Sequence, residues 1–235
     1  MIHPDTELRF VGPEIGYGVF ARRRIPCGTI VWVIDDLDMR FTLAEVRAKP
    51  PAVRRLLDHY GLLHHSGLRI VPWDFGRFVN HACDPNVLPT AWDFEIAVRD
   101  IEAGEQLTND YATLNLERPF RCHCGGGVCR GRVRPGDFEP LVRGWDEEVR
   151  RCLPDLLRVE QPLWEYVRRP AVVRRSIVSA GPIPSVERNR FGPAREDPLA
   201  YAAVPGRRAR GRLKASPVAA PPPRPAVARS APSRA

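Results

Sequence analysis

The sequence contains few cysteines and lacks long apolar segments. Six cysteines in 235 residues are too few for a disulfide-dense secreted scaffold. The longest uninterrupted apolar run covers only residues 199–204, whereas a membrane-spanning helix needs about 20 apolar residues. Residues 1–7 are polar and lack the apolar core of a secretory signal. We therefore expect no membrane partner and, by default, a cytoplasmic protein.

Charge is distributed unevenly along the chain. Residues 1–140 contain 17 Lys and Arg against 19 Asp and Glu, whereas residues 141–235 contain 19 against 9. The net charge of +8 therefore arises in the C-terminal part. From residue 181 onward, 11 of the 25 prolines and 11 basic residues accompany only three acids, which is typical of disordered chain. We expect a disordered basic tail over residues 181–235.

The rest of the sequence alternates between strand-like and helix-like patterns. Short apolar, β-branched runs bounded by Gly and Pro predict strands, and they occur at 8–35, 68–71, 87–91 and 94–99. Apolar residues recur at helical spacing in 42–63, with a break at Pro50-Pro51, and in 141–169. Trp145 and Trp164 are expected to be core anchors of the second helical region rather than a ligand cage. The predicted fold class is mainly β with short helices.

Three short motifs contain residue types that bind ligands, although each also has a simple structural explanation. Residues 16–18 read Gly-Tyr-Gly, which permits close backbone approach to a ligand but alone is more typical of a hairpin turn. Residues 77–86 read Arg-Phe-Val-Asn-His-Ala-Cys-Asp-Pro-Asn. A capped turn explains the final Asp-Pro-Asn but not the Asn-His pair or the Cys. Residues 104–111 read Gly-Glu-Gln-Leu-Thr-Asn-Asp-Tyr, which alone fits a turn that enters a strand.

A cysteine cluster forms the fourth motif. Cys122, Cys124 and Cys129 have C-x-C-x4-C spacing, which favours metal binding over disulfides. Three thiolates are one ligand short of a tetrahedral structural zinc site. His123 lies between two of the ligands, where it would strain a single metal centre, so Cys83 is the better fourth ligand.

Two further features are expected to be structural. Cys27 and Cys152 are interpreted as buried or bystander thiols. His64-His65 contains metal-ligand residue types, but an exposed loop or a capped helix end is the favoured interpretation.

In this order, the four motifs resemble those of the SET-domain protein-lysine methyltransferases. That family has a GxG turn, an NHxCxPN segment, an ELxxDY-like segment and a post-SET cysteine cluster, and the matching segments here lie within residues 8–131. The family's cysteine-rich pre-SET region has no counterpart, so the chain resembles a minimal form. The resemblance implies a SET-domain fold of several small sheets with a threaded C-terminal segment, followed by a helical extension and the tail. The implied divisions are a SET domain at 1–118, a post-SET zinc-binding loop at 119–135, a helical extension at 136–180 and the tail at 181–235.

The resemblance also implies the site residues and the reaction. A methyl group would pass from S-adenosylmethionine to the side-chain amine of a lysine in a protein substrate, either a histone or another basic protein. Tyr111 would be the catalytic tyrosine. The cofactor-binding residues would be Gly16, Tyr17, Gly18, Arg77, Asn80, His81, Tyr111 and Phe120. One structural Zn²⁺ would be bound by Cys83, Cys122, Cys124 and Cys129.

The chemistry of methyl transfer agrees with this assignment. An in-line displacement requires mainly alignment of the reacting groups. A lysine with a pKa of ~10.4 must first lose a proton, and desolvation beside a cationic sulfonium lowers that pKa. No covalent intermediate is needed, so we interpret no cysteine as a nucleophile. Asn109 replaces the family's usual Phe or Tyr two residues before Tyr111, which leaves open whether the product is a mono-, di- or trimethyllysine.

Other interpretations remain at this point. A SET-like domain without turnover could act as a zinc-stapled binding module for nucleic acid or protein, but the presence of Asn80, His81 and Tyr111 favours an enzyme. A nucleic-acid-binding zinc knuckle is disfavoured because residues 1–140 are near neutral. The arginine-rich segment 207–212 is either a weak nucleic-acid contact or a solvated tail. Lys214 is a candidate for self-methylation, and a chromatin-like substrate would imply nucleoid or nuclear association.

Overall fold

The computed structural model describes residues 1–179 and 181–192. The hypotheses on the segment 207–212 and on Lys214 lie outside the described residues. Within the described part, none of the helices is long and apolar enough to span a membrane.

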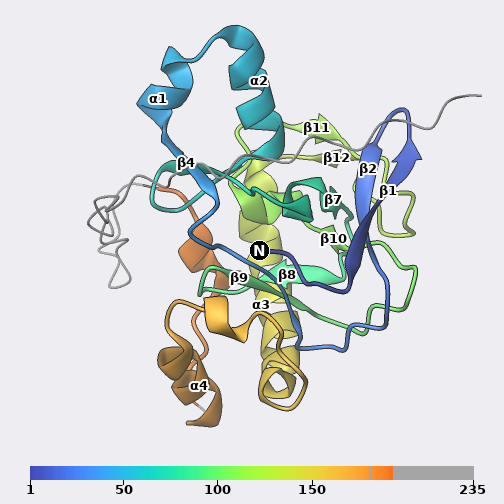
Figure 1. Ribbon diagram of the computed structural model, residues 1–235, viewed down its shortest axis with the longest axis vertical. Coiled ribbons are helices and arrows are strands. Elements are labelled where there is room, and N and C mark those ends of the chain that lie inside the picture. The colour runs from blue at the N-terminus through green and yellow to red at the C-terminus, as the bar shows by residue number, and fades with distance from the viewer. Residues whose placement is uncertain (180, 193–235) are drawn as a thin grey trace, which may run out of the picture. The chain divides into compact units, whose positions relative to one another are not determined.

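Four small sheets contain all of the strands described (Figure 1). The first is the hairpin of β1 (Thr6–Gly12) and β2 (Gly16–Ala21). The five-stranded sheet has the order β3 (Ile30–Val33), β9 (Phe94–Ala97), β8 (Val87–Pro89), β10 (Thr108–Asn109) and β7 (Asn80–His81). The third sheet has the order β4 (Met39–Thr42), β6 (Leu68–Val71) and β5 (Leu62–Leu63). The fourth pairs β11 (Phe120–Arg121) with β12 (Arg132–Val133).

The helices are short, as the sequence predicts. The α-helices are α1 (Leu43–Ala48), α2 (Pro51–Tyr60), α3 (Phe138–Cys152) and α4 (Pro170–Val178). The 3₁₀ helices are η1 (Phe75–Phe78), η2 (Tyr111–Leu114), η3 (Pro135–Asp137), η4 (Leu153–Leu157), η5 (Trp164–Tyr166) and η6 (Val186–Asn189). A mainly β fold with short helices and several small sheets is thus confirmed.

The predicted break between the first two helices has a local cause. Thr42 accepts a hydrogen bond from the backbone N–H of Glu45, and the Glu45 carboxylate accepts one from the backbone N–H of Thr42. This reciprocal capping box starts α1. Pro51 occupies the first turn of α2, where its missing N–H leaves no helical hydrogen bond unmade.

Two short parallel strands bring distant motifs together in the five-stranded sheet. Thr108 pairs with Asn80, and Asn109 pairs with His81. The Asn86 side chain fixes this arrangement, because its Oδ1 accepts a hydrogen bond from the Thr108 backbone at 2.8 Å and its Nδ2 donates to the Gln106 carbonyl at 2.8 Å. Asn86 is buried, so these bonds are made in the protein interior, where an unpaired amide would be costly.

The C-terminal extension packs on the same core as the sheets. Trp145 of α3 is buried and meets Phe138 edge-to-face, with ring centroids 5.4 Å apart. Both belong to one apolar cluster with Ile30 and Phe94 of the five-stranded sheet, and α3 runs behind β8 and β9 in Figure 1. The structure thus places Trp145 in the core, as an anchor.

Residues 181–192 differ from the expectation of a tail disordered from residue 181. Val186 is buried, and its backbone N–H donates to the Asp146 carboxylate at 2.8 Å. The Asn189 side chain donates to the Thr90 carbonyl at 2.9 Å. A single apolar anchor and a few hydrogen bonds therefore order a short segment whose average composition is that of disordered chain.

Cys27 and Cys152 also differ from their expected state. A disulfide joins them, with their Cα atoms 6.0 Å apart, which lies within the usual range for this bond. The interpretation of the two as separate thiols was therefore wrong. They are 125 residues apart, and only the packing of α3 on the sheet brings them together.

Gln161 attaches the extension to the edge strand β3. Its Oε1 accepts a hydrogen bond from the Ile30 backbone at 2.8 Å, and its Nε2 donates to the Gly28 carbonyl at 2.9 Å. We predict that Gln161→Ala lowers the free energy of unfolding by about 1–3 kcal/mol, because buried backbone groups lose their partners. Urea denaturation measures the change. Glu160→Ala, which removes the side chain of the neighbouring exposed residue, serves as control. An equal loss in the two variants would contradict this role.

Candidate functional site

One cavity of about 1090 Å³ contains most of the residues that the sequence singled out. This volume lies at the upper end for small-molecule sites, so it has room for a cofactor and for a substrate side chain. The predicted site residues that line it are Gly16, Tyr17, Arg77, Asn80, His81, Tyr111 and Phe120. Gly18 is not part of the lining.

The Gly-Tyr-Gly turn is tied to β7. Gly16 has a φ of +83°, a conformation that favours glycine. A Cβ on Gly18 would lie 2.5 Å from the Gln106 amide nitrogen and 2.9 Å from that of Asn80. The Asn80 side chain donates to the Tyr17 carbonyl at 3.0 Å. Because Gly18 has no side chain, β7 can lie close to the turn. The backbone of the turn faces the cavity.

His81 uses its ring within the protein. The backbone N–H of Tyr111 donates to His81 Nδ1 at 3.2 Å, and His81 Nε2 lies 3.4 Å from the sulfur of Cys83. Because Nδ1 accepts, we assign the ring proton to Nε2, which then donates to the sulfur. Burial lowers the pKa of His81, which favours this neutral form. Both ring nitrogens of His81 are thus hydrogen-bonded within the protein, and only its backbone groups remain to contact a ligand.

Tyr111 places a neutral hydroxyl at the cavity wall. The hydroxyl donates to the Val79 carbonyl at 2.8 Å. Burial, together with the nearby Glu95 carboxylate, raises the pKa of Tyr111 to about 12, so the phenol keeps its proton at neutral pH. The Phe120 ring completes an aromatic group, with its centroid 5.8 Å from that of Tyr111 and 5.3 Å from that of His81.

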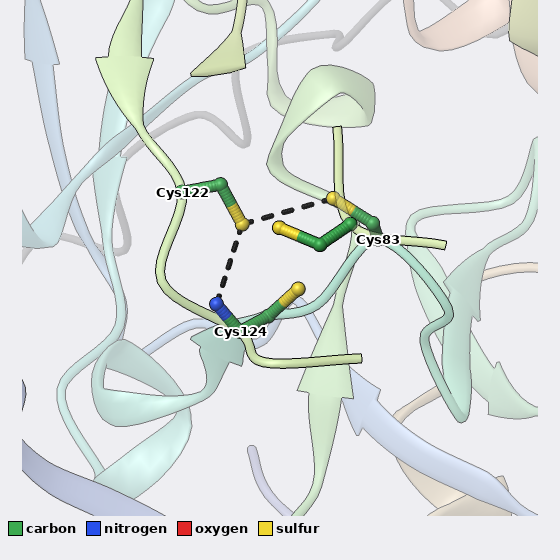
Figure 2. Close-up of side chains that lie close together, drawn as sticks. Cys83, Cys122 and Cys124 are labelled. Carbon is green, nitrogen blue, oxygen red and sulfur yellow. Dashed lines mark hydrogen bonds between the residues drawn. The ribbon is translucent and has the colours of Figure 1, made fainter. Parts of the chain in front are cut away.

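Four thiols converge next to His81, and Figure 2 shows the labelled side chains of Cys83, Cys122 and Cys124 close together. The sulfur atoms of Cys83, Cys122, Cys124 and Cys129 all lie within 4.8 Å of one another. The grouping includes Cys83 and not His123, which is exposed. A set of four sulfur donors in this arrangement suits a tetrahedral Zn²⁺ site.

Hydrogen bonds from backbone N–H groups to sulfur favour the thiolate forms that a metal requires, whereas burial opposes them. The backbone N–H of Cys124 donates to the Cys122 sulfur at 3.4 Å, and that of Gly131 donates to the Cys129 sulfur at 3.4 Å. Burial raises the pKa of the Cys122 thiol. Burial also acts to raise that of Cys124, but hydrogen bonds from backbone groups and neighbouring thiols outweigh it and lower the pKa of Cys124 to about 6.

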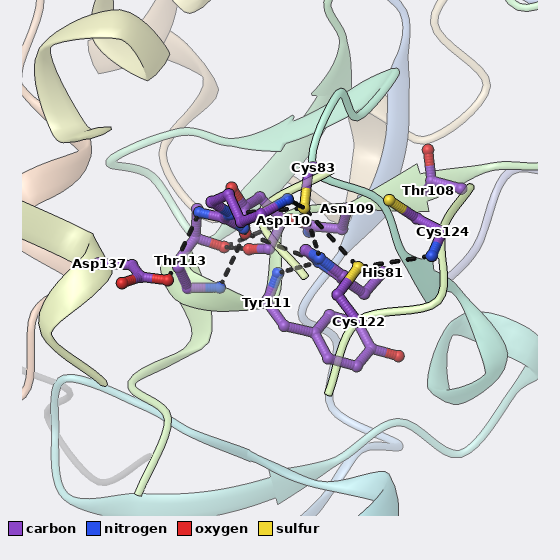
Figure 3. Close-up of polar contacts among 12 residues, drawn as sticks. His81, Cys83, Thr108, Asn109, Asp110, Tyr111, Thr113, Cys122, Cys124 and Asp137 are labelled. Atoms are coloured by element: carbon purple, nitrogen blue, oxygen red, sulfur yellow. Dashed lines mark hydrogen bonds and ion pairs between the residues drawn. The ribbon is translucent and has the colours of Figure 1, made fainter. Parts of the chain in front are cut away.

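Arg130 and Asp110 connect the thiols to the Tyr111 segment, and the sequence motifs assigned no role to either. Figure 3 shows Asp110 and Tyr111 close to Cys83 and Cys122. The backbone N–H and Nε of Arg130 donate to the Cys83 sulfur at 3.3 and 3.4 Å. Arg130 Nη2 donates to the Asp110 carboxylate at 2.6 Å. Asp110 also accepts from the backbone N–H of Ala112 at 3.1 Å and thereby caps η2. In the sequence, the position of Arg130 directly after Cys129 was the feature that could have indicated its contact with the thiols.

Glu95 and Asn109 form a second polar pair in the cavity lining. Asn109 Nδ2 donates to Glu95 Oε1 at 2.6 Å, and the Thr113 hydroxyl donates to Asn109 Oδ1 at 3.3 Å. Asn109 thus makes fixed contacts within the protein. Burial raises the pKa of Glu95 from 4.5 to about 7. The only sequence signal for Glu95 was an acid in the otherwise apolar strand β9.

His64, His65 and Asp93 lie together elsewhere in the fold. Their ligand atoms fall within 4.8 Å of one another, and His64 Nε2 is 3.1 Å from the Asp93 carboxylate. His64 is buried, so the expectation of an exposed loop was wrong for this residue. Its hydrogen bonds to Asp93 and to the Ser66 hydroxyl at 2.7 Å account for a histidine in the interior.

The raised pKa of Glu95 predicts a pH dependence of stability. The folded protein binds this proton more tightly than the unfolded chain, so the stabilising effect is complete below pH 4.5 and is lost as pH rises to about 7. At about 1.4 kcal/mol per tenfold change in proton affinity, the loss amounts to about 3 kcal/mol. Unfolding of the wild type and of Glu95→Gln at pH 5 and pH 8 tests this. Relative to the wild type, the free energy of unfolding of the variant should be higher at pH 8 than at pH 5. An equal difference at the two pH values would contradict the assignment.

Comparison with known proteins identifies part of the chain. Residues 16–112 match the family model described as SET domain. A curated relative, histone-lysine N-methyltransferase ASHR3 of Arabidopsis thaliana, is 38% identical over 84 residues, which cover 32% of this chain and 17% of the relative. Histone-lysine N-methyltransferase ash1 of Drosophila melanogaster is 30% identical over 145 residues, which cover 56% of this chain and 6% of the relative. The chain thus matches less than a fifth of the length of either relative.

Among solved structures, the chain is similar to the methyltransferase domain of human histone-lysine N-methyltransferase SETMAR, with a TM-score of 0.39 and 21% sequence identity. The match covers 56% of this chain and 57% of that chain. The family match contains the Gly-Tyr-Gly turn, the Asn-His segment and Tyr111. Residues 16–112 therefore match the SET-domain family, and the curated proteins similar to the chain include histone-lysine methyltransferases.

Proposed function

We propose that this protein is an S-adenosylmethionine-dependent protein-lysine N-methyltransferase. The observation that carries the proposal is the pairing of β7 with β10, which brings Asn80, His81 and Tyr111 to one cavity. The substrate is a protein that presents a target lysine. A histone is the first candidate because the curated relatives are named for histone-lysine methylation, and another basic protein is the alternative.

The cofactor would lie between the Gly-Tyr-Gly turn and the aromatic group. The turn and β7 supply backbone groups, since the side chains of Asn80 and His81 are hydrogen-bonded within the protein. The Phe120 ring offers an apolar face for an adenine. Bound S-adenosylmethionine would supply an electrophilic methyl group on a sulfonium.

Tyr111 would orient the lysine amine. Its hydroxyl is neutral and fixed by the Val79 carbonyl, so it can accept a hydrogen bond from an amine without becoming charged. The surrounding rings exclude water from the reacting groups and favour a desolvated, neutral amine. Alignment inside a dry cavity supplies most of what a displacement reaction requires.

We further propose that the four thiols bind one structural Zn²⁺ and that residues 119–135 form a post-SET loop. The metal would supply a crosslink between Cys83, close to β7, and the loop that contains the other three cysteines. The hydrogen bonds from backbone N–H groups to three of these sulfur atoms fit thiolate ligands. This crosslink would hold Phe120 and the start of the loop against His81.

Cofactor binding and Tyr111→Phe test the enzymatic proposal. We expect titration calorimetry to detect S-adenosylmethionine binding to the wild type, with Tyr111→Phe retaining it. The variant should lose about 100-fold in labelling of a basic protein mixture, because misplacement of the amine costs about that much. Tyr166→Phe removes a hydroxyl outside the cavity lining and serves as control, which should keep both cofactor binding and labelling. A wild type that does not bind the cofactor would overturn the proposal.

The zinc proposal predicts the metal content of two neighbouring variants. Elemental analysis should find about one zinc per wild-type chain, much less in Cys124→Ser, and an unchanged content in His123→Ala, because His123 lies outside the group of thiols. Removal of a ligand should also destabilise the loop, since binding free energy contributes to folding. Zinc lost from His123→Ala but kept in Cys124→Ser would show that the ligand set is wrong.

A further inference from the structure

Glu95 is a buried acid in the wall of the cavity without a positively charged partner. It is 8% exposed and is among the cavity-lining residues. Asn109 donates a hydrogen bond to its Oε1, and among the described residues no basic side chain forms an ion pair with it. A buried carboxylate is costly unless it is paired, and an unpaired acid that faces a cavity is typical of a functional site.

The groups around Glu95 leave a cation as the missing partner. Trp32 of β3 and Pro89 of β8 flank it in the sheet, and Asn109 approaches from β10. Tyr111 stays neutral because burial and Glu95 raise its pKa to about 12. His64, His65 and Asp93 line a second pocket together with Glu95, and both histidines contact the Asp93 carboxylate. Burial lowers the pKa of His64, and among the described residues no basic side chain pairs with the Glu95 carboxylate.

The walls next to Glu95 fit the apolar part of a long amine. Trp32, Leu62 and Leu114 line the cavity with Glu95. The Trp32 indole nitrogen is buried and has no hydrogen-bond partner among the described residues. An aliphatic chain with a charged end matches such a site, because its methylene groups pack on apolar walls while its head reaches the acid.

We propose that Glu95, oriented by Asn109, binds the ammonium group of the target lysine and accepts its proton. The inference rests on the proposed methyltransferase function and adds to it the group that makes the amine reactive. Tyr111 cannot accept the ammonium proton, because its hydroxyl is already protonated.

The proton transfer balances within the site. One N–H bond of the ammonium breaks, an O–H bond forms on Glu95, and the electron pair of the broken bond stays on nitrogen as the lone pair that methyl transfer needs. Burial disfavours both charged partners, so it stabilises the neutral acid and neutral amine relative to the ion pair of carboxylate and ammonium. The proton then passes from Glu95 to solvent. A carboxyl with a pKa of about 7 suits this exchange at neutral pH.

The assignment also gives the methylation state a physical meaning. Glu95 can accept a hydrogen bond only from an amine that retains an N–H, and each methyl group removes one. Amines with N–H groups should therefore bind better than a quaternary ammonium. Asn109, which holds the carboxyl in place, would act on product multiplicity through Glu95.

Binding of butylammonium chloride to the full chain tests the proposal without turnover or cofactor. Since Glu95 is mostly protonated at pH 6 and mostly ionised at pH 8, NMR titration should show about tenfold tighter binding at pH 8. Burial lowers the pKa of His81, which favours its neutral form over this range. Butyltrimethylammonium should bind more weakly than butylammonium.

The matched variants separate this inference from the proposed function. Glu95→Gln should bind butylammonium weakly and equally at both pH values, whereas Glu102→Gln, the same change on an exposed carboxyl, should behave as the wild type. Binding that does not change with pH, or that is unaltered in Glu95→Gln, overturns the assignment of Glu95. If calorimetry with S-adenosylmethionine still succeeds in that case, only this inference fails. A protein that binds butylammonium as expected but no cofactor would instead overturn the methyltransferase proposal.

Discussion

The parallel pairing of β7 with β10 is the interaction on which the rest of the site depends. Two residue pairs, Asn80 with Thr108 and His81 with Asn109, join segments that are about 28 positions apart. The pairing is too short to be stable by itself, and the buried Asn86 side chain supports it with hydrogen bonds to the β10 segment. This contact places His81 next to Tyr111 in the cavity lining.

A continuous polar network extends from the pairing to the thiols. His81 contacts the Tyr111 backbone on one side and the Cys83 sulfur on the other. Arg130 bonds the same sulfur and also Asp110, so the cysteine loop and the tyrosine segment share two links. A change in the charge of the thiols would act on the cavity through these links. This coupling would give a physical reason for the proposed structural metal next to the proposed cofactor site.

Local patterns were sufficient to predict many of the elements and the outline of the site. The capping residues Thr42 and Glu45, Pro51 and the alternation of apolar runs determine where short helices and strands begin. The motif residues could be selected because their types and order are unusual. Convergence of the four cysteines also agreed with their spacing.

Contacts between distant residues could not be predicted in the same way. The Glu95–Asn109 pair, the Cys27–Cys152 disulfide and the anchor of Asn189 on Thr90 all depend on how elements pack. Local propensity contains no such information. An acid within an apolar strand is noticeable in the sequence, but only the structure shows that Glu95 faces a cavity rather than solvent.

The central claim is that the thiol cluster and the cofactor cavity form one coupled unit through His81. The most direct measurement is calorimetric titration of S-adenosylmethionine into the protein before and after zinc is removed with a chelator. The account predicts that metal removal weakens cofactor binding about tenfold or more and that restored zinc recovers it. Equal affinity with and without the metal would contradict the coupling.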